Sequence, residues 1–185
     1  MVATLVLYAL VSQATAFRIE PAGAEAGFDL KATAHTVHGV TTQVKGDVRV
    51  EPLPDGALKL SGRIEIGTAS MRTGNERRDA TMHDKSLLVA TYPAIVFEPD
   101  RFTPKDPAKT DGAIAGELSG RLTIRGQSKA HSIAATLTPR GERIEAAGEF
   151  DVAWADFGIP DPSFFVVRIE KVAHARFRAT FVPVR

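Results

Sequence analysis

The chain has 185 residues, 44% of them hydrophobic, which is enough for one domain with a sizeable core. Its 23 basic and 22 acidic side chains leave a formal charge of +1, so no global field favours binding to nucleic acid or to an anionic membrane. The chain contains no cysteine, which excludes disulfides, thiolate catalysis and cysteine-ligated metals.

The first feature in chain order is an apolar run over residues 2–11, which is too short to span a bilayer comfortably. Ala14-Thr15-Ala16 follows it with the small-x-small pattern of a secretory cleavage site. No basic n-region precedes the run. We therefore predict that residues 1–16 are a signal peptide with a truncated start, and that residues 17–185 form the domain. The alternative is an extra apolar strand or helix.

Strand patterns with turn residues between them fill most of the remaining chain. Apolar and polar side chains alternate over residues 28–34, 44–50, 58–66, 95–97, 114–124, 133–137, 144–152 and 173–181. We expect the segments 118–124 and 133–137 to form a hairpin around a polar turn at residues 126–129. About eight such strands predict an all-β sandwich or barrel, and a closed barrel of eight strands can hold one small ligand.

Several of these strands carry glycine where a large core side chain is expected, at Gly62, Gly116, Gly120 and Gly148. Glycine within a strand marks a bend, a bulge or the close approach of another group. Two interpretations stay open: small inward residues leave an unfilled lumen, or they permit the barrel to curve.

One segment departs from the β pattern and predicts a short helix over residues 73–85, crossing one end of the barrel. Thr73 and Glu76 have the spacing of a capping box. Asp79 and His83 share one helix face. Tyr92-Pro93 then restarts a strand, and residues 99–112 predict the longest polar loop.

Two arrangements suggest chemistry, and each has a simpler explanation. His35 and His38 form an H-x-x-H pair, but on a strand their side chains point to opposite faces and no acidic third ligand is nearby, so we expect no metal site. Asp79, His83 and Ser86 can be read as an oriented base with a nucleophile, but they lack a nucleophile-elbow context and a surface pair explains them equally well. A hydrolase acting on an amphipathic substrate is therefore the alternative prediction.

The most polar cluster beside the apolar pattern comprises Asn75, Arg77, Arg78 and Asp79. An arginine fork at the mouth of a barrel can bind a carboxylate, a quinone oxygen or a pyrophosphate. The alternative is a solvated helix surface, with Arg78 and Asp79 tied to neighbouring loops.

Aromatic side chains gather near the C-terminus and indicate either an apolar pocket or closure of one barrel end. They are Phe150, Trp154, Phe157, Phe164 and Phe165.

Five motifs follow one another in a characteristic order. They read FRIEP at residues 17–21, FDLKAT with HTVHG at 28–39, TGN with Arg78-Asp79 and Met82 at 73–82, YPAIVF at 92–97, and GRLTIRGQSK at 120–129. Together they resemble the YceI-like family of polyisoprenoid-binding, lipocalin-like barrels. One departure is Leu87-Leu88-Val89-Ala90, where the family often has Phe-Phe-Asp; this changes one wall of the expected pocket.

The resemblance implies an elongated antiparallel barrel of about eight strands around an apolar tunnel, with a short helix near one end. It implies a non-catalytic carrier for a long isoprenoid lipid, such as a polyprenol, a prenyl pyrophosphate or an isoprenoid quinone, in the bacterial periplasm or outside the cell. No cofactor, metal, nucleic acid or transmembrane span is expected, and a homodimer is compatible with the sequence. A ligand-free secreted interaction module is a further alternative.

We predict that the ligand is bound by apolar wall residues, with three polar residues at the mouth. The wall residues are Phe28, Leu30, Leu60, Ile66, Met71, Met82, Leu88, Ile95, Phe97, Leu122, Phe150, Trp154 and Phe165. The mouth residues are Asn75, Arg78 and Asp79.

Overall fold

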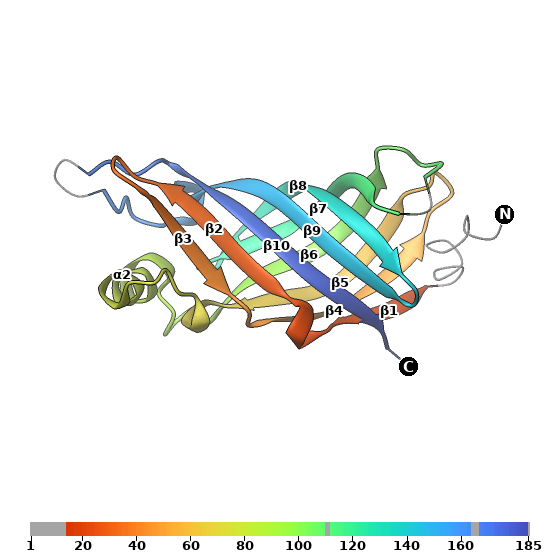
Figure 1. The fold of residues 1–185 in the computed structure, drawn as a ribbon, viewed down its shortest axis with the longest axis horizontal. Helices are drawn as coiled ribbons and strands as arrows, with labels where there is room; N and C mark the ends of the chain where they lie inside the picture. Colours follow the sequence, from red (N-terminus) through yellow and green to blue (C-terminus); the bar gives the residue numbers. More distant parts are fainter. Residues whose placement is uncertain (1–13, 110–111, 164–166, 185) are drawn as a thin grey trace.

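Alternating side chains place most of the chain in antiparallel strands, which curl into an elongated barrel in the computed structural model (Figure 1). The structure describes residues 14–109, 112–163 and 167–184. The strands are β1 (Thr15–Ile19), β2 (Glu25–Lys31), β3 (Thr36–Thr41), β4 (Val44–Pro52), β5 (Leu58–Gly67), β6 (Ala94–Pro104), β7 (Ile114–Ile124), β8 (Gln127–Arg140), β9 (Arg143–Ala153) and β10 (Val172–Pro183).

Eight of these strands close the barrel, in the order β1-β4-β5-β6-β7-β8-β9-β10, because β1 pairs with both β4 and β10. The 3₁₀ turn η1 (Pro21–Gly23) breaks the chain between β1 and β2, so β10 pairs with β1 near its end and with β2 nearer its start. The β2–β3 hairpin extends the wall at one end of the barrel. The predicted all-β barrel of about eight strands is thereby confirmed.

The hairpin predicted around residues 126–129 exists, but its turn begins one residue earlier and has only two residues. Ile124 pairs directly with Gln127, which leaves Arg125 and Gly126 as the whole turn. Both have positive φ, 49° and 72°, as a two-residue type I′ turn requires. The polar residues after Gly126 belong to β8.

The polar loop predicted over residues 99–112 is wrong in its first part, because β6 continues to Pro104. The register shifts between Pro99 and Arg101, a bulge that accommodates a proline inside a strand. Beyond the bulge Phe102 is 1% exposed, so burial of this side chain holds the strand to the barrel.

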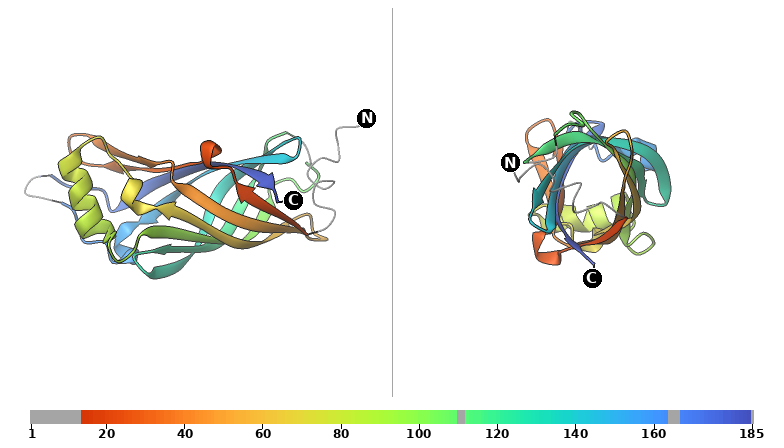
Figure 2. Two further views of the ribbon diagram at one scale, coloured as in Figure 1. Left: turned by 90° about the horizontal axis from the view of Figure 1, so that it is seen from below. Right: turned by 90° about the vertical axis from the view of Figure 1, so that its right-hand side faces the viewer.

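One helical segment crosses an end of the barrel, as predicted, and is formed by α2 (Glu76–Thr81) and a π-helical turn η3 (Met82–Leu87) (Figure 2, left). The predicted capping box of Thr73 and Glu76 is wrong. Asn75 is the N-cap, and its side-chain oxygen accepts a hydrogen bond from the Arg78 amide at 3.0 Å. None of the helices in the described ranges is both long and apolar enough to cross a membrane.

The strand glycines fall into two groups, those that lie under a phenylalanine ring and one at a point of curvature. A methyl group added at Gly116, Gly120 or Gly148 would lie 2.5–2.7 Å from ring carbons of Phe102, Phe97 or Phe177, respectively. These phenylalanine rings therefore lie over the glycines of neighbouring strands and stay flat against the wall. Gly62 instead has φ +148° and lies where the β5–β6 register shifts, so it serves curvature.

The N-terminal apolar run lies outside the described residues. The described chain enters the barrel at Thr15, which pairs with Val50 on β4, and Ala16 pairs with Arg49. The strand thus begins two residues before the predicted domain start at Phe17.

Candidate ligand-binding cavity

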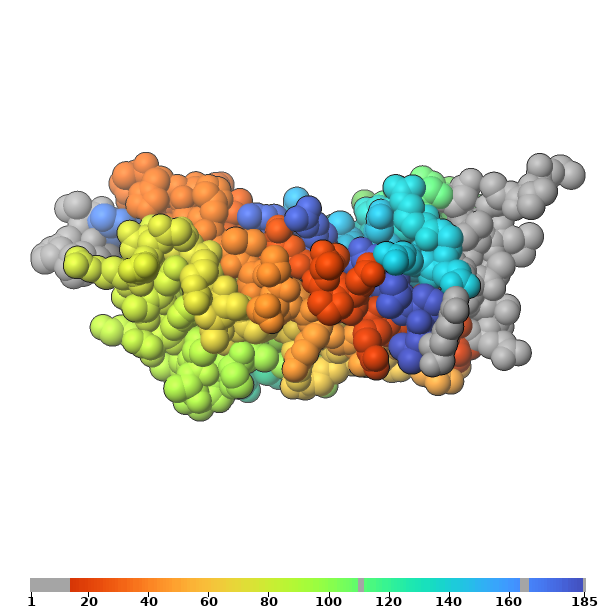
Figure 3. All heavy atoms as spheres, turned by 60° about the horizontal axis from the view of Figure 1, so that its bottom comes forward, coloured from red at the N-terminus to blue at the C-terminus, as the bar shows by residue number. Residues whose placement is uncertain are grey.

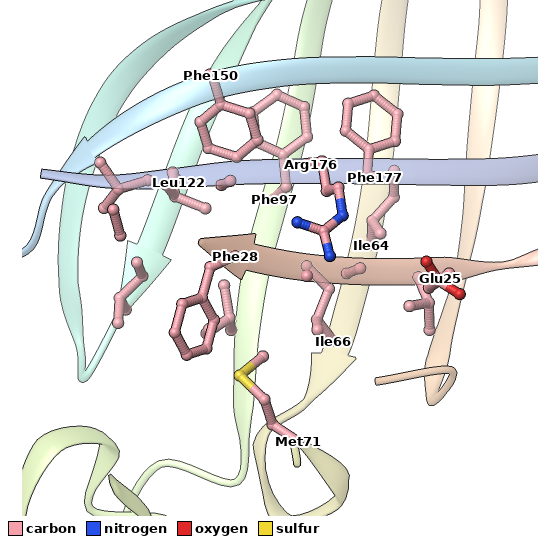
Figure 4. A pocket seen from close by; sticks show the side chains of 18 of the residues that line it. Glu25, Phe28, Ile64, Ile66, Met71, Phe97, Leu122, Phe150, Arg176 and Phe177 are labelled. Atoms are coloured by element: carbon pink, nitrogen blue, oxygen red, sulfur yellow. The ribbon is translucent and has the colours of Figure 1, made fainter. Parts of the chain in front are cut away.

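The inward side chains of the barrel leave a cavity of about 620 Å³ between its two ends (Figure 4). Its walls are overwhelmingly apolar. The end away from α2 is filled by Phe17, Phe102 and Ile114, each 1–2% exposed. At the other end α2 and η3 form the surface, as the yellow-green atoms of Figure 3 show.

Most of the predicted ligand-binding residues border this cavity. They are Phe28, Leu30, Leu60, Ile66, Met71, Asn75, Arg78, Met82, Ile95, Phe97, Leu122, Phe150 and Trp154. Phe164 and Phe165 lie outside the described residues. Phe157 is buried in the core but does not border the cavity.

Leu88 does not border the cavity, and Leu87 takes its place. The reason is the π-helical turn, which has more residues per turn than an α-helix and so rotates the following side chains. Leu88 ends the turn in the left-handed conformation, with φ 51° and ψ 54°, and this redirects the chain toward β6. A sequence pattern based on 3.6 residues per turn misses this rotation.

Asp79 does not border the cavity either, because its carboxylate holds the segment that leads into α2. Its Oδ1 accepts hydrogen bonds from the Thr73 hydroxyl at 2.5 Å and from the Thr73 amide at 2.8 Å. Burial raises the pKa of Asp79, but these two hydrogen bonds and the positive charges of Arg72 and His83 outweigh burial and hold this pKa below its ordinary value.

Arg78 borders the cavity but is also tied to the same segment. Its Nε donates to the Thr73 hydroxyl oxygen and its Nη2 to the Thr73 carbonyl, both at 2.8 Å. These contacts agree with the alternative that Arg78 and Asp79 are tied to a neighbouring loop. Arg77, Thr81 and Ser86 border the same end of the cavity and were not among the predicted site residues.

Three charged residues on β2 and β10, Glu25, Arg176 and Arg178, also border the cavity, and their charges are paired (Figure 4). Arg176 forms a salt bridge with Asp29 at 2.5 Å, and Arg178 forms one with Glu25 at 3.0 Å.

The predicted catalytic pair is not assembled as a base with its orienting acid. His83 Nε2 lies 2.9 Å from the Met71 carbonyl, which can only accept, so this nitrogen carries the proton and donates it there. Asp79 Oδ1 accepts its hydrogen bonds from the amide and hydroxyl of Thr73. His38 is paired with Asp29 at 2.8 Å, and the described residues contain no group of three or more potential metal ligands.

The sequence interpretation missed many wall residues that alternation alone could have found. They include Val48, Ile64, Ile133, Ile144, Phe177 and Phe181. All lie on inward positions of strands whose pattern was visible. Alternation did not show how far along the barrel each inward residue lies, because this depends on how neighbouring strands are staggered.

Comparisons with known proteins agree with this architecture. A model of the YceI-like domain matches residues 17–181. A polyisoprenoid binding domain from Saccharophagus degradans, implicated in plant cell wall breakdown, is 15% identical, with a TM-score of 0.70 over 93% of this chain and 100% of that one. Burkholderia cenocepacia BcnA is 16% identical, with a TM-score of 0.66 and coverage of 88% and 98%.

A further solved structure, the YCEI protein of Campylobacter jejuni, is 17% identical and has a TM-score of 0.60, with coverage of 83% of this chain and 88% of that one. Among curated protein sequences no significant match was found. At identities of 15–17%, the similarity to these solved structures shows that the fold is shared.

Proposed function

This chain belongs to the YceI-like domain family, and we propose that it binds one long-chain amphipathic lipid of the isoprenoid type in its barrel, without chemical conversion. The observation that carries the proposal is the apolar cavity of about 620 Å³ inside the barrel. Small-molecule sites are commonly of this size, mostly apolar, with a few polar groups that orient the ligand. Apart from the ion-paired Glu25, Arg176 and Arg178, the polar residues that border the cavity lie at one end, on α2, η3 and the segment before α2.

The driving force would be removal of the chain from water. Each buried CH₂ is worth about 0.8 kcal/mol, so about ten enclosed carbons contribute roughly 8 kcal/mol. This is comparable to the cost of association, about 4–15 kcal/mol. An apolar ligand chain of at least this length is therefore expected.

The comparisons support an isoprenoid as the apolar part of the ligand, since one structure with the same fold is a polyisoprenoid binding domain. A carrier role rather than hydrolysis is supported by the contacts of Asp79, whose Oδ1 accepts hydrogen bonds from Thr73 instead of orienting His83.

Extraction of the purified protein with organic solvent, followed by mass spectrometry, tests the proposal directly. A reproducible co-purified isoprenoid is the expected result. Absence of such a lipid, together with no binding of added prenol or quinone, would contradict the proposal.

A variant that fills the cavity gives a second test. Ala175 borders the cavity on β10 between Phe28 of β2 and Phe150 of β9. Ala175→Trp should occupy the lumen and lower the amount of bound lipid at least about tenfold, because overlapping volumes cannot both be accommodated in a packed interior. The matched control is Ala130→Trp, an exposed alanine on β8 outside the cavity. Equal lipid content in the two folded variants would argue against the cavity as the binding site.

We further propose that the protein acts in the bacterial periplasm or outside the cell after removal of residues 1–16. Cleavage there would leave Phe17, which pairs with Val48 and Pro183, as the first barrel residue. Intact-mass measurement of protein from the periplasmic fraction tests this. A mass that includes residues 1–16 would refute the processing.

A further inference from the structure

Three residues that border the cavity at its α2 end, Asn75, Arg77 and Ser86, have side-chain hydrogen-bond donors with no acceptor among the described residues. We propose that this end selects an anionic headgroup, a carboxylate or phosphate, over a neutral one, with Arg77 as the residue that makes the selection. This inference rests on the proposed lipid-binding function and specifies the ligand of the same cavity.

The charges that border the cavity are unevenly compensated. Glu25 is the only carboxylate among the described residues that border it, and this carboxylate is bound by Arg178. Arg176 is bound by Asp29. At the α2 end, by contrast, the bordering residues include two arginines and no described carboxylate.

The two arginines of α2 differ in their availability. Arg78 donates to the hydroxyl and carbonyl of Thr73, and that hydroxyl in turn donates to Asp79. No described group forms a hydrogen bond or salt bridge with the guanidinium of Arg77; only the Arg77 backbone carbonyl has a side-chain partner, the Thr81 hydroxyl. Arg77 therefore presents a charged fork at the cavity without an acidic partner.

Two neutral residues that border the same end of the cavity add further donors. Asn75 uses its oxygen to cap α2, which leaves its side-chain NH₂ as the free part of the amide. Ser86 borders the cavity, and its hydroxyl has no partner in the described structure. Oxyanions accept several such hydrogen bonds at once, and charge-assisted bonds from arginine are the stronger ones. A prenol or a quinone offers no negative charge to match.

Three ligands that share the same isoprenoid chain and differ only in their headgroup test this selection. They are farnesol, farnesoic acid and farnesyl phosphate. We expect the two anions to bind at least about tenfold more tightly than farnesol, a difference that one charge-assisted contact can supply. Whether carboxylate or phosphate binds more tightly then identifies which oxyanion fits the mouth. Added salt should weaken anion binding while leaving farnesol binding nearly unchanged, since only the charged interaction is screened.

Arg77→Gln should remove most of this preference, with anion affinity falling about tenfold and farnesol affinity changing less than about twofold. Lys85→Gln is the matched control, because Lys85 lies in the adjoining π-helical turn and does not border the cavity. Asn75→Asp adds an independent variant that keeps a capping oxygen but places a carboxylate at the mouth; it should weaken anion binding only.

Equal affinity for the three ligands, or an unchanged preference in Arg77→Gln, would overturn the anionic selection while leaving lipid binding in place. If none of the three ligands binds, both the selection and the proposed function fail.

Discussion

The carboxylate of Asp79 shows how one buried residue shapes the mouth without touching the cavity. Asp79 is 7% exposed and accepts two hydrogen bonds from Thr73, a residue that borders the cavity. Arg78 contacts the same threonine from the other side. Thr73 is thereby fixed by its amide, its carbonyl and its hydroxyl, and the entry to α2 is fixed with it.

Asp79→Asn should lower the free energy of unfolding by about 1–2 kcal/mol near neutral pH, because charge-assisted hydrogen bonds to Thr73 become neutral ones. The pKa of Asp79 is lowered in the folded protein, so the carboxylate stabilises the fold above its unfolded pKa. That contribution is lost as the pH falls through the folded pKa. The difference between parent and variant should thus shrink below about pH 4.

Urea unfolding over a pH series measures this difference. Asp84→Asn, which removes an exposed carboxylate of the same helical segment, is the control and should have little effect. A difference between Asp79→Asn and the parent that grows toward acid pH would contradict the assignment.

At the level of strands, phenylalanine and glycine positions are matched across neighbours. The clearest case joins β2 and β3, where Phe28 is in register with Gly39 and a methyl group on Gly39 would overlap the Phe28 ring. The ring can lie against the wall only because β3 has no side chain at that point. The same arrangement on β7 and β9 lets large aromatic residues line a cavity without filling it.

Gly39→Ala should therefore lower the free energy of unfolding by about 1–3 kcal/mol, the usual cost of overpacking. In a Phe28→Leu background the same substitution should cost less than half as much, because the overlapping ring is gone. A double-mutant cycle by thermal or urea unfolding gives the coupling. An equal loss of unfolding free energy in both backgrounds would show that the Phe28 ring is not the reason why position 39 requires glycine.

Over the whole molecule the two ends of the barrel are built differently. The end near the described termini is filled by Phe17, Phe102 and Ile114. The other end is covered by α2 and η3 (Figure 2, left), and the unpaired polar groups border the cavity there. A ligand in this barrel is expected to lie with its apolar tail toward the filled end. The filled end would then set the chain length that fits.

Phe102→Ala should extend the cavity at the filled end and lower the free energy of unfolding by about 3–5 kcal/mol. Among ligands with one headgroup, the preferred chain should become longer. Phe102→Leu, which leaves a smaller void, should have a smaller effect on both quantities. Competition between prenols of different length, together with urea unfolding, measures them; an unchanged length preference in folded Phe102→Ala would place the tail elsewhere.

The strands β2 and β4 to β10, the helix at the barrel end and the family were predictable from the chain alone, because alternation and local motifs are properties of neighbouring residues. Alternation did not indicate β1 and β3. Leu118, Leu122 and Ile124 share a face by their spacing, and all three border the cavity. Such a pattern states which side a residue faces. The pattern does not show which residues that side chain faces across the barrel.

Tertiary structure alone decided which inward residues enclose space and which polar residues are consumed by the fold. Arg77 and Arg78 are adjacent and chemically identical, yet Thr73 engages only Arg78. Leu87 rather than Leu88 borders the cavity because a π-helical turn rotates the chain. The physical reason is common to both: side-chain periodicity is local, whereas hydrogen-bond partners and strand stagger depend on segments that meet only when the barrel closes.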